Sequence, residues 1–301
     1  IVRLWTAMRN YKEDARFGPE IEQRLIEAYR KIRNTWRFLL GNVSDYEPGR
    51  DAVAAANLLD LDRWILHRFE EVRARVVKAY LDYEFYPVLH DVLDFFTVEL
   101  SAFYLDVVKD RAYCSAKGSL ERRSAQTAMF IILRDSLLLM APILSFTADE
   151  AWTHVPAFPG KDDFVHLGEF PKAQDWLGTL GAGFVEDMEK LLGVREKVLK
   201  ELEKAREAKL IGNALEAAVT LKAPAADAGF LAARKDDLAA LFIVSAVSVE
   251  TAAGDDLVIE VAKAPGGKCE RCWNFSTHVG TSPDYPAFCA RCEKVVKAAR
   301  P

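Results

Sequence analysis

The chain has 301 residues, of which half are apolar and 28% are charged, and its formal net charge at pH 7 is −5. This length and apolar content allow two or three globular domains, whereas the acidic balance excludes a protein that holds nucleic acid through overall positive charge. No apolar run approaches about 18 residues and no secretory signal pattern is present, so we expect a cytoplasmic protein with no membrane partner.

The first ten residues, IVRLWTAMRN, have the pattern of a helix interior and contain no initiating methionine. Val2, Trp5 and Leu4 are placed to pack against a following bundle. We therefore expect the chain to be a fragment of a longer protein.

Residues 18–41 are predicted to form a long helix with two faces. Pro19 suits its first turn and Gly41 its C-terminal end. Apolar residues recur at helical spacing, namely Leu25, Tyr29, Ile32, Trp36 and Leu39. A second face, about 130° away, carries Arg30, Arg33, Asn34 and Arg37. That face is either a solvated surface or one that follows nucleic-acid phosphates, since arginine makes bidentate phosphate contacts.

The next 115 or so residues are predicted to be helical after a loop at 42–57 that contains Pro48 and Gly49. The expected helices run from 57 or 60 to 85, from 87 to 114, from 119 to 142 and from 143 to 155. Pro87 suits a first turn, and Ser119 is the expected cap of the third of these helices.

We predict no catalytic residue in this helical region. The aromatic residues at 95, 96, 103 and 104 are interpreted as core. Glu150 and Trp152 are interpreted as structural, because the acid has no visible catalytic partner. The remaining candidates are isolated and are interpreted as packed or surface residues, namely His67, His90, His154, His166 and Cys114.

Residues 154–176 are rich in proline, glycine and aspartate and mark the best domain boundary. A charged helix is expected beyond it, at 184–210, and Gly212 would end it. The alternating patterns that follow predict a small α+β module, with strands at 218–221, 242–250 and 257–262 and a helix at 226–241. No acid pair, nucleophile–base pair or glycine-rich phosphate loop occurs in this module.

Two C-x-x-C knuckles predict a metal site near the end of the chain. They are Cys269–Cys272 and Cys289–Cys292, separated by residues 273–288. Each knuckle offers two thiolates on one turn, and together they complete a tetrahedron, so we predict one structural Zn²⁺. A redox pair would explain one knuckle but not two. His278 is left out, since four thiolates close the site and leave no position for catalytic water.

Arginine and aromatic residues surround the knuckles. Arg271 and Trp273 form a second candidate nucleic-acid patch, weaker than the helical one. The aromatic side chains here either stack on unpaired bases or pack over the ribbon, and they are Trp273, Phe275, Tyr285 and Phe288.

Several long sequence motifs resemble those of a known family. YKEDARFGPEI and YRKIRNTWRFLLGN resemble the anticodon-binding helical domain of the class Ia aminoacyl-tRNA synthetases, and LDRW, AYLDYEF, ELSAFYLDVVKDRAYC, RSAQTA and APILSFTADEAW extend the likeness to about residue 170. EKAREAKLIGNALEAAVTL resembles the junction after that bundle. The CERCW…CARC ribbon resembles the zinc module of bacterial-type isoleucyl-tRNA synthetases and the ribbon of formamidopyrimidine DNA glycosylases. The combination points to the isoleucine enzymes.

The resemblance implies a mainly α fold in three parts: an anticodon-binding helical bundle at 1–170, a small α+β junction module at 171–264 and a four-cysteine zinc ribbon at 265–301. It implies a C-terminal part of an enzyme that activates isoleucine with ATP and transfers it to isoleucine tRNA. The ATP site and the catalytic and editing domains would be partners outside this stretch, which carries no HIGH-type or KMSKS-type motif. We expect the fragment to be inactive alone and monomeric.

The resemblance implies that the helical bundle holds the anticodon stem-loop of tRNA on its polar face. The expected tRNA face is Arg30, Arg33, Asn34 and Arg37, with Arg271 and Trp273 as a second patch. Two other function classes stay open. One is a separate nucleic-acid-binding zinc-ribbon protein, and the other is a structural helical module whose ribbon docks on another domain.

Overall fold

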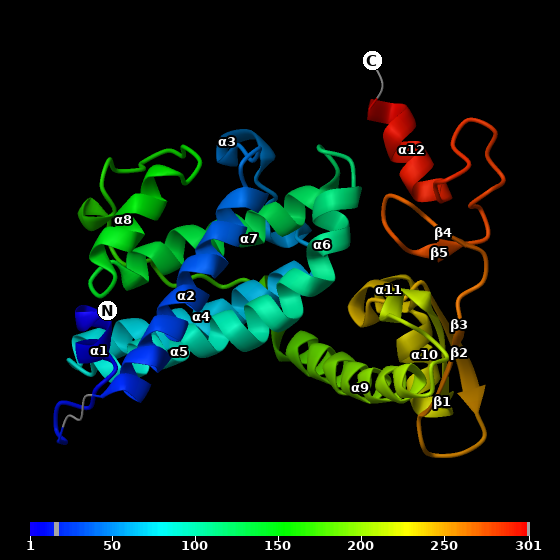
Figure 1. The fold of residues 1–301 in the computed structure, drawn as a ribbon, viewed down its shortest axis with the longest axis horizontal. Coiled ribbons are helices and arrows are strands. Elements are labelled where there is room, and N and C mark those ends of the chain that lie inside the picture. The colour runs from blue at the N-terminus through cyan, green and yellow to red at the C-terminus, as the bar shows by residue number, and fades with distance from the viewer. Residues whose placement is uncertain (15–17, 300–301) are drawn as a thin grey trace. The chain divides into compact units, whose positions relative to one another are not determined.

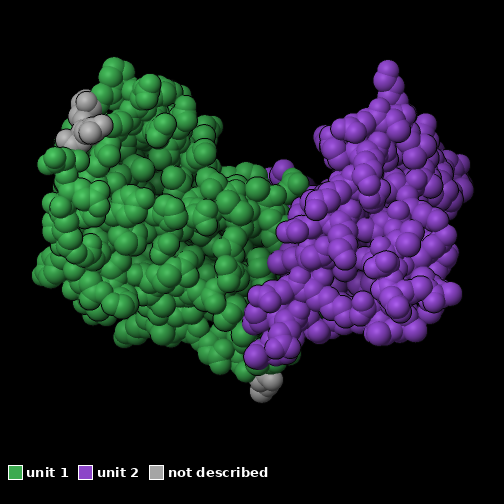
Figure 2. All heavy atoms as spheres, turned by 90° about the horizontal axis from the view of Figure 1, so that it is seen from below, with its two compact units in different colours: residues 1–106, 117–181 green, residues 107–116, 182–301 purple. Residues whose placement is uncertain are grey.

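The structure, a computed structural model, describes residues 1–14 and 18–299 (Figure 1). Residues 15–17, which fall within the first motif quoted above, and residues 300–301 lie outside the described residues. The chain forms two compact units (Figure 2). Unit 1 contains residues 1–106 and 117–181, and unit 2 contains residues 107–116 and 182–301.

Unit 1 is built from helices, as the sequence predicted. In chain order they are α1 (Val2–Ala7), α2 (Pro19–Asn42), α3 (Pro48–Asp51), η1 (Ala55–Asn57), α4 (Asp60–Leu81), α5 (Phe85–Asp94), the π-helix η2 (Phe95–Tyr104), the first residues of α6 (Leu105–Cys114), α7 (Leu120–Met140), α8 (Ser145–Thr153), η3 (Val165–Leu167) and η4 (Gly178–Leu180). Helix α4 packs on α5 and α7, and α2 lies against α7 and α8.

Helix α2 matches the predicted bounds to within one residue, since it ends at Asn42 rather than Gly41, and it has the predicted buried stripe. Pro19 occupies the first turn, after an extended Gly18. The stripe is buried except for the half-buried Tyr29. The indole Nε1 of Trp36 donates a hydrogen bond to the Ser136 hydroxyl of α7, at 3.0 Å. This bond satisfies the polar atom of a large side chain whose burial holds α2 on the bundle.

Two stretches differ from the sequence prediction. The expected loop at 42–57 contains the short helices α3 and η1, because the Asp51 carboxylate accepts a hydrogen bond from the Glu47 backbone N–H (3.0 Å) and closes a turn. The expected helix after Pro87 changes to π geometry over Phe95–Tyr104 and runs on into α6 without a break. The aromatic residues of this π segment are buried, so their interpretation as core is confirmed.

A buried carboxylate connects three helices of unit 1. Asp62 of α4 is fully buried. It accepts hydrogen bonds from the Tyr104 hydroxyl of η2, at 2.8 Å, and from the Ser124 hydroxyl of α7. The Ser124 oxygen in turn accepts a bond from the Leu59 backbone N–H, at 2.9 Å. Because buried polar groups are costly without partners, this network specifies how α4, η2 and α7 meet.

Unit 2 combines helices with two small sheets. Besides residues 107–116 of α6, it contains α9 (Gly181–Glu207, whose first residue closes unit 1), η5 (Ala214–Glu216), β1 (Ala217–Pro224), α10 (Ala225–Ala232), α11 (Lys235–Phe242), β2 (Ala246–Ala252), β3 (Val258–Lys263), β4 (Gly267–Lys268), β5 (Phe275–Ser276) and α12 (Ala290–Ala299).

The larger sheet has the strand order β2-β1-β3, with β1 parallel to β2 and antiparallel to β3. Helices α10 and α11 make the crossover between the parallel strands and pack on them. The predicted helix at 226–241 is therefore two helices, and the strand predicted from Phe242 was wrong at its start. Phe242 is a buried residue that ends α11, and Ile243 after it is left-handed (φ 58°).

The C-terminal ribbon is a two-stranded hairpin, β4 and β5, followed by α12. At Gly266 (φ +89°) an added Cβ would lie only 2.3 Å from the Ser276 backbone. Glycine is therefore required there for the hairpin to close.

None of the helices in the described residues is both long enough and apolar enough to span a bilayer.

We predict that Asp62→Ala lowers the free energy of unfolding of unit 1 by about 3 kcal/mol, because it leaves two buried hydroxyl groups without their charged acceptor. Urea unfolding followed by tryptophan fluorescence measures this, since every tryptophan except Trp273 lies in unit 1. Asp60→Ala, an exposed acid on the same helix, is the control and should change stability far less. Equal losses in the two variants would show that the network contributes nothing.

Candidate metal centre and nucleic-acid interface

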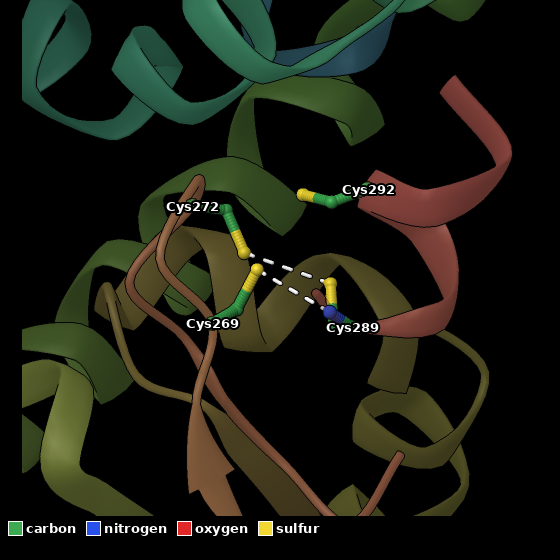
Figure 3. Close-up of side chains that lie close together, drawn as sticks. All are labelled: Cys269, Cys272, Cys289 and Cys292. Atoms are coloured by element: carbon green, nitrogen blue, oxygen red, sulfur yellow. Dashed lines mark hydrogen bonds between the residues drawn. The ribbon is translucent and has the colours of Figure 1, made fainter. Parts of the chain in front are cut away.

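The four cysteines of the two knuckles converge in unit 2 (Figure 3). Their sulfur atoms all lie within 4.8 Å of one another, all four side chains are buried, and none forms a disulfide. Cys269 and Cys272 lie in the turn after β4, whereas Cys289 precedes α12 and Cys292 lies in its first turn. The Cys272 and Cys289 sulfurs are 3.7 Å apart.

The backbone prepares one of these sulfurs for negative charge. Burial raises the pKa of the Cys269 thiol, but backbone N–H groups of Cys272, Cys289 and Arg271 donate to its sulfur and bring the pKa down to about 6. The bond from the Cys289 N–H measures 3.3 Å. A closed set of four sulfur donors suits a soft metal ion held in tetrahedral geometry. The residues present therefore fit a structural metal site.

Charged side chains around the cluster are engaged within unit 2. Arg271 donates to the backbone carbonyls of Cys114 and Tyr113 at the end of α6, and its Nη1 lies 3.7 Å from the Cys292 sulfur. His278 does not join the cluster, because its Nε2 lies 2.8 Å from the buried Glu293 carboxylate. That carboxylate also accepts a bond from the Ser282 hydroxyl, at 2.9 Å.

The four aromatic residues of the ribbon differ in exposure. Tyr285 is buried and stacks on Phe288, with ring centroids 5.9 Å apart, and Phe288 packs on the cysteine cluster. Trp273 is 60% exposed, and the Lys268 ammonium lies 5.3 Å from its ring centroid. Of the four, Trp273 therefore offers the most open ring face for a base.

The polar face of α2 is exposed in unit 1. Arg30, Arg33, Asn34 and Arg37 are all solvent-accessible, and within the described residues none of these four side chains makes a hydrogen bond or an ion pair. Several other arginines of this unit are paired. For example, Arg123 of α7 binds Asp51 at 3.2 Å. The structure thus keeps three guanidinium groups available on one side of one helix.

A groove runs along this face, between α2 and α8, with a volume of about 170 Å³. It is lined by Arg33, Trp36, Arg37, Leu40, Thr147, Glu150, Ala151 and His154. The α8 residues share one side of that helix, which their spacing of 3, 1 and 3 already indicates. Glu150 and His154 were not predicted as groove residues, because no linear pattern in the sequence shows that α8 lies beside α2. Trp152, by contrast, is buried.

A comparison with protein families decides the class of the helical part. Residues 62–221, more than half of the chain, match the family described as the anticodon-binding domain of tRNA ligase. The chain belongs to this family. The anticodon-binding match includes α8 but begins after α2. Residues 266–295 match a second family, the zinc finger found in FPG and IleRS. This matched segment contains all four clustered cysteines.

Several curated relatives of this chain are named isoleucine–tRNA ligase. The isoleucine–tRNA ligase of Syntrophotalea carbinolica is 48% identical over 98% of the chain and 32% of the relative. The enzyme of Geobacter sulfurreducens is 45% identical over 99% of the chain and 33% of the relative. That of Thermotoga maritima is 42% identical over 100% of the chain and 33% of the relative. The chain therefore spans about a third of the length of these relatives.

Proposed function

We propose that this chain is the tRNA-binding part of an isoleucine–tRNA ligase and that it recognises the anticodon stem-loop of isoleucine tRNA. The observation that carries the proposal is the unpaired arginine face of α2 in a chain that belongs to the anticodon-binding family. The names of the relatives support isoleucine as the amino acid. The larger enzyme would activate isoleucine with ATP and transfer it to tRNA, using catalytic and editing domains that these residues do not provide.

The chemistry of the α2 face suits an RNA loop. Phosphates supply much of the affinity for nucleic acid, and arginine binds them through two parallel N–H groups. Bases in a loop are unstacked, so side chains reach their edges and faces. Arg30, Arg33, Asn34 and Arg37 would supply these contacts. Trp273 would add a stacking surface from unit 2, whereas Arg271 already donates to backbone carbonyls and would contribute mainly charge.

The four cysteines would hold one Zn²⁺ with a structural role. The ion would neutralise the repulsion between four buried thiolates and supply folding energy to a ribbon with little apolar core of its own. The family match and the clustered sulfurs support this proposal. The domain boundaries at 170 and 264, a monomeric state and a cytoplasmic location belong to the same proposal.

Charge removal on the arginine face of α2 tests its role in tRNA binding. Arg33→Gln with Arg37→Gln should weaken binding of isoleucine tRNA and reduce the slope of log K against log salt by about 2, one for each lost phosphate contact. Arg24→Gln is the matched control, because Arg24 is exposed on another side of α2. Affinity and salt slope that stay at wild-type values would refute the assignment. Excess duplex DNA as competitor separates tRNA binding from general nucleic-acid binding.

Metal removal tests the structural role of the four cysteines. The purified chain should contain one zinc per molecule by elemental analysis, and a strong chelator should make residues 265–299 sensitive to protease while the helical signal of unit 1 persists. Cys272→Ser should lower the zinc content, whereas Cys114→Ser should not, because Cys114 packs beside the four cysteines but is not one of the four clustered metal-binding sulfurs. A chain that stays protease-resistant without any bound metal would contradict the structural role.

An exchange assay tests whether the chain alone activates isoleucine. The chain alone should show no isoleucine-dependent ATP–pyrophosphate exchange, because its sequence has no nucleotide-binding motif of the expected type. A full-length relative, such as the Geobacter sulfurreducens enzyme, is the positive control. Exchange by the purified chain above a no-enzyme blank would overturn this prediction.

A further inference from the structure

The two knuckles of the metal centre carry an arginine at the same position. The first reads Cys-Glu-Arg-Cys and the second Cys-Ala-Arg-Cys, so Arg271 and Arg291 each precede the second cysteine of a knuckle. Metal binding alone does not require this, because the two middle residues of a C-x-x-C knuckle are not ligands. The repeated arginine therefore needs another explanation, and the contacts of the two guanidinium groups supply one.

Each arginine donates to a sulfur of the opposite knuckle. Nη1 of Arg271 lies 3.7 Å from the Cys292 sulfur. The bonds of Arg291 to Asp110, and after them a hydrogen bond to the Cys272 sulfur, raise the pKa of Arg291. Both sulfurs belong to buried cysteines (Figure 3). Four thiolates leave a net negative charge on a bound divalent ion, and a nearby guanidinium group offsets part of it.

The same two arginines hold the end of α6. Arg271 donates to the carbonyls of Cys114 and Tyr113, the latter at 3.4 Å. Arg291 binds both oxygens of the Asp110 carboxylate, with Nη2 2.6 Å from Oδ1. The last carbonyls of a helix have no partner within the helix and carry partial negative charge, so a guanidinium group stabilises them. All of these residues lie in unit 2.

Ordinary surface pairing does not account for this arrangement. The Arg291 side chain is 46% exposed, and an exposed ion pair contributes little to stability. Both arginines nevertheless make the same double contact, with one bond to a sulfur of the metal centre and others to residues 110–114 of α6. The two connections between the cysteine cluster and this helix end therefore run in parallel.

We propose that Arg271 and Arg291 couple metal binding to the end of α6. A bound ion draws the two knuckles together, and each arginine then spans from a sulfur of the opposite knuckle to α6. Without the ion the knuckles separate, the arginines lose the sulfurs, and residues 110–114 lose the groups that hold them. Neither arginine binds the ion, so both are positioning residues. This inference rests on the proposed zinc site and adds the helix end that responds to it.

Zinc affinity is the first readout, measured on the full chain by competition with a chromophoric chelator. Arg271→Gln with Arg291→Gln should weaken zinc binding by about 10- to 100-fold, the range for groups that orient metal ligands. Lys294→Gln is the matched control, because it removes the same charge from an exposed position shortly after Cys292. Wild-type affinity in the double arginine variant, or an equal loss in the control, would overturn the inference.

The absorption of cobalt(II) bound in place of zinc is the second readout. An N–H group that donates to a thiolate lowers the energy of the sulfur electrons, so its removal should move the sulfur-to-cobalt charge-transfer band to longer wavelength. The band should shift in Arg271→Gln and in Arg291→Gln but not in Lys294→Gln. Arg291 is exposed enough for its variant to fold, and a merely structural role would leave the band in place. A band at the wild-type position in both arginine variants contradicts the coupling.

Hydrogen exchange of backbone amides in α6 is the third readout. Removing zinc from the wild-type chain should speed exchange at residues 110–114, whereas exchange in α4 of unit 1 should not change. In the double arginine variant these α6 amides should exchange fast even at saturating zinc, and slow exchange there would refute the coupling. If the wild-type chain binds no zinc, the proposed metal site fails as well. If it binds zinc and the arginine variants behave like the wild type, only this inference fails.

Discussion

The burial of Trp36 determines what unit 1 presents to solvent. Its indole is almost fully covered, bonds to Ser136 on α7 at 3.0 Å, and meets the Phe96 ring edge-on, with centroids 6.4 Å apart. Burying a side chain of this size stabilises a fold by about 1.5–3 kcal/mol or more and permits few rotations of its helix. Once α2 is held in this orientation, its arginines must face outward. The α2 surface is therefore a consequence of packing as much as of charge.

Unit 1 and the C-terminal ribbon of unit 2 are stabilised by different interactions. Unit 1 is large enough for an apolar core, and it uses a buried carboxylate at Asp62 to specify how its helices meet. The ribbon has few apolar residues, and its centre is made of thiols with Phe288 and Val279 packed against them. Around that centre, Arg271 and Glu293 satisfy backbone and side-chain groups that would otherwise be left unpaired. The chain thus joins a helical unit stabilised by buried apolar surface with a ribbon whose buried thiols are arranged to coordinate a metal ion.

Local patterns were sufficient for much of this structure. The spacing of apolar residues predicted both faces of α2, and the serine before α7 accepts the predicted capping bond, from the Arg122 N–H. The knuckle spacing predicted that the four cysteines meet, which the clustered sulfurs confirm. Patterns failed where distant segments meet. His154 lies more than a hundred residues from Arg33, and the link from Arg271 to the end of α6 depends on backbone carbonyls, which have no sequence signature. The π geometry of η2 was also missed. The apolar pattern of this stretch indicates which residues are buried, but it does not show how many residues each helical turn contains.

The discontinuity of unit 2 bears on the order in which the protein is made. The carbonyls at the end of α6 and the guanidinium of Arg271 that binds them are 157 residues apart in the chain. At about 5–20 residues per second, a ribosome would need roughly 8–30 s to travel between them. During that interval the Cys114 and Tyr113 carbonyls lack the guanidinium that binds them in the finished fold. Unit 2 therefore completes its folding last, because it needs both residues 107–116 and residues 182–301. A shortened gene that begins at residue 182 would encode a ribbon without the end of α6 that Arg271 binds.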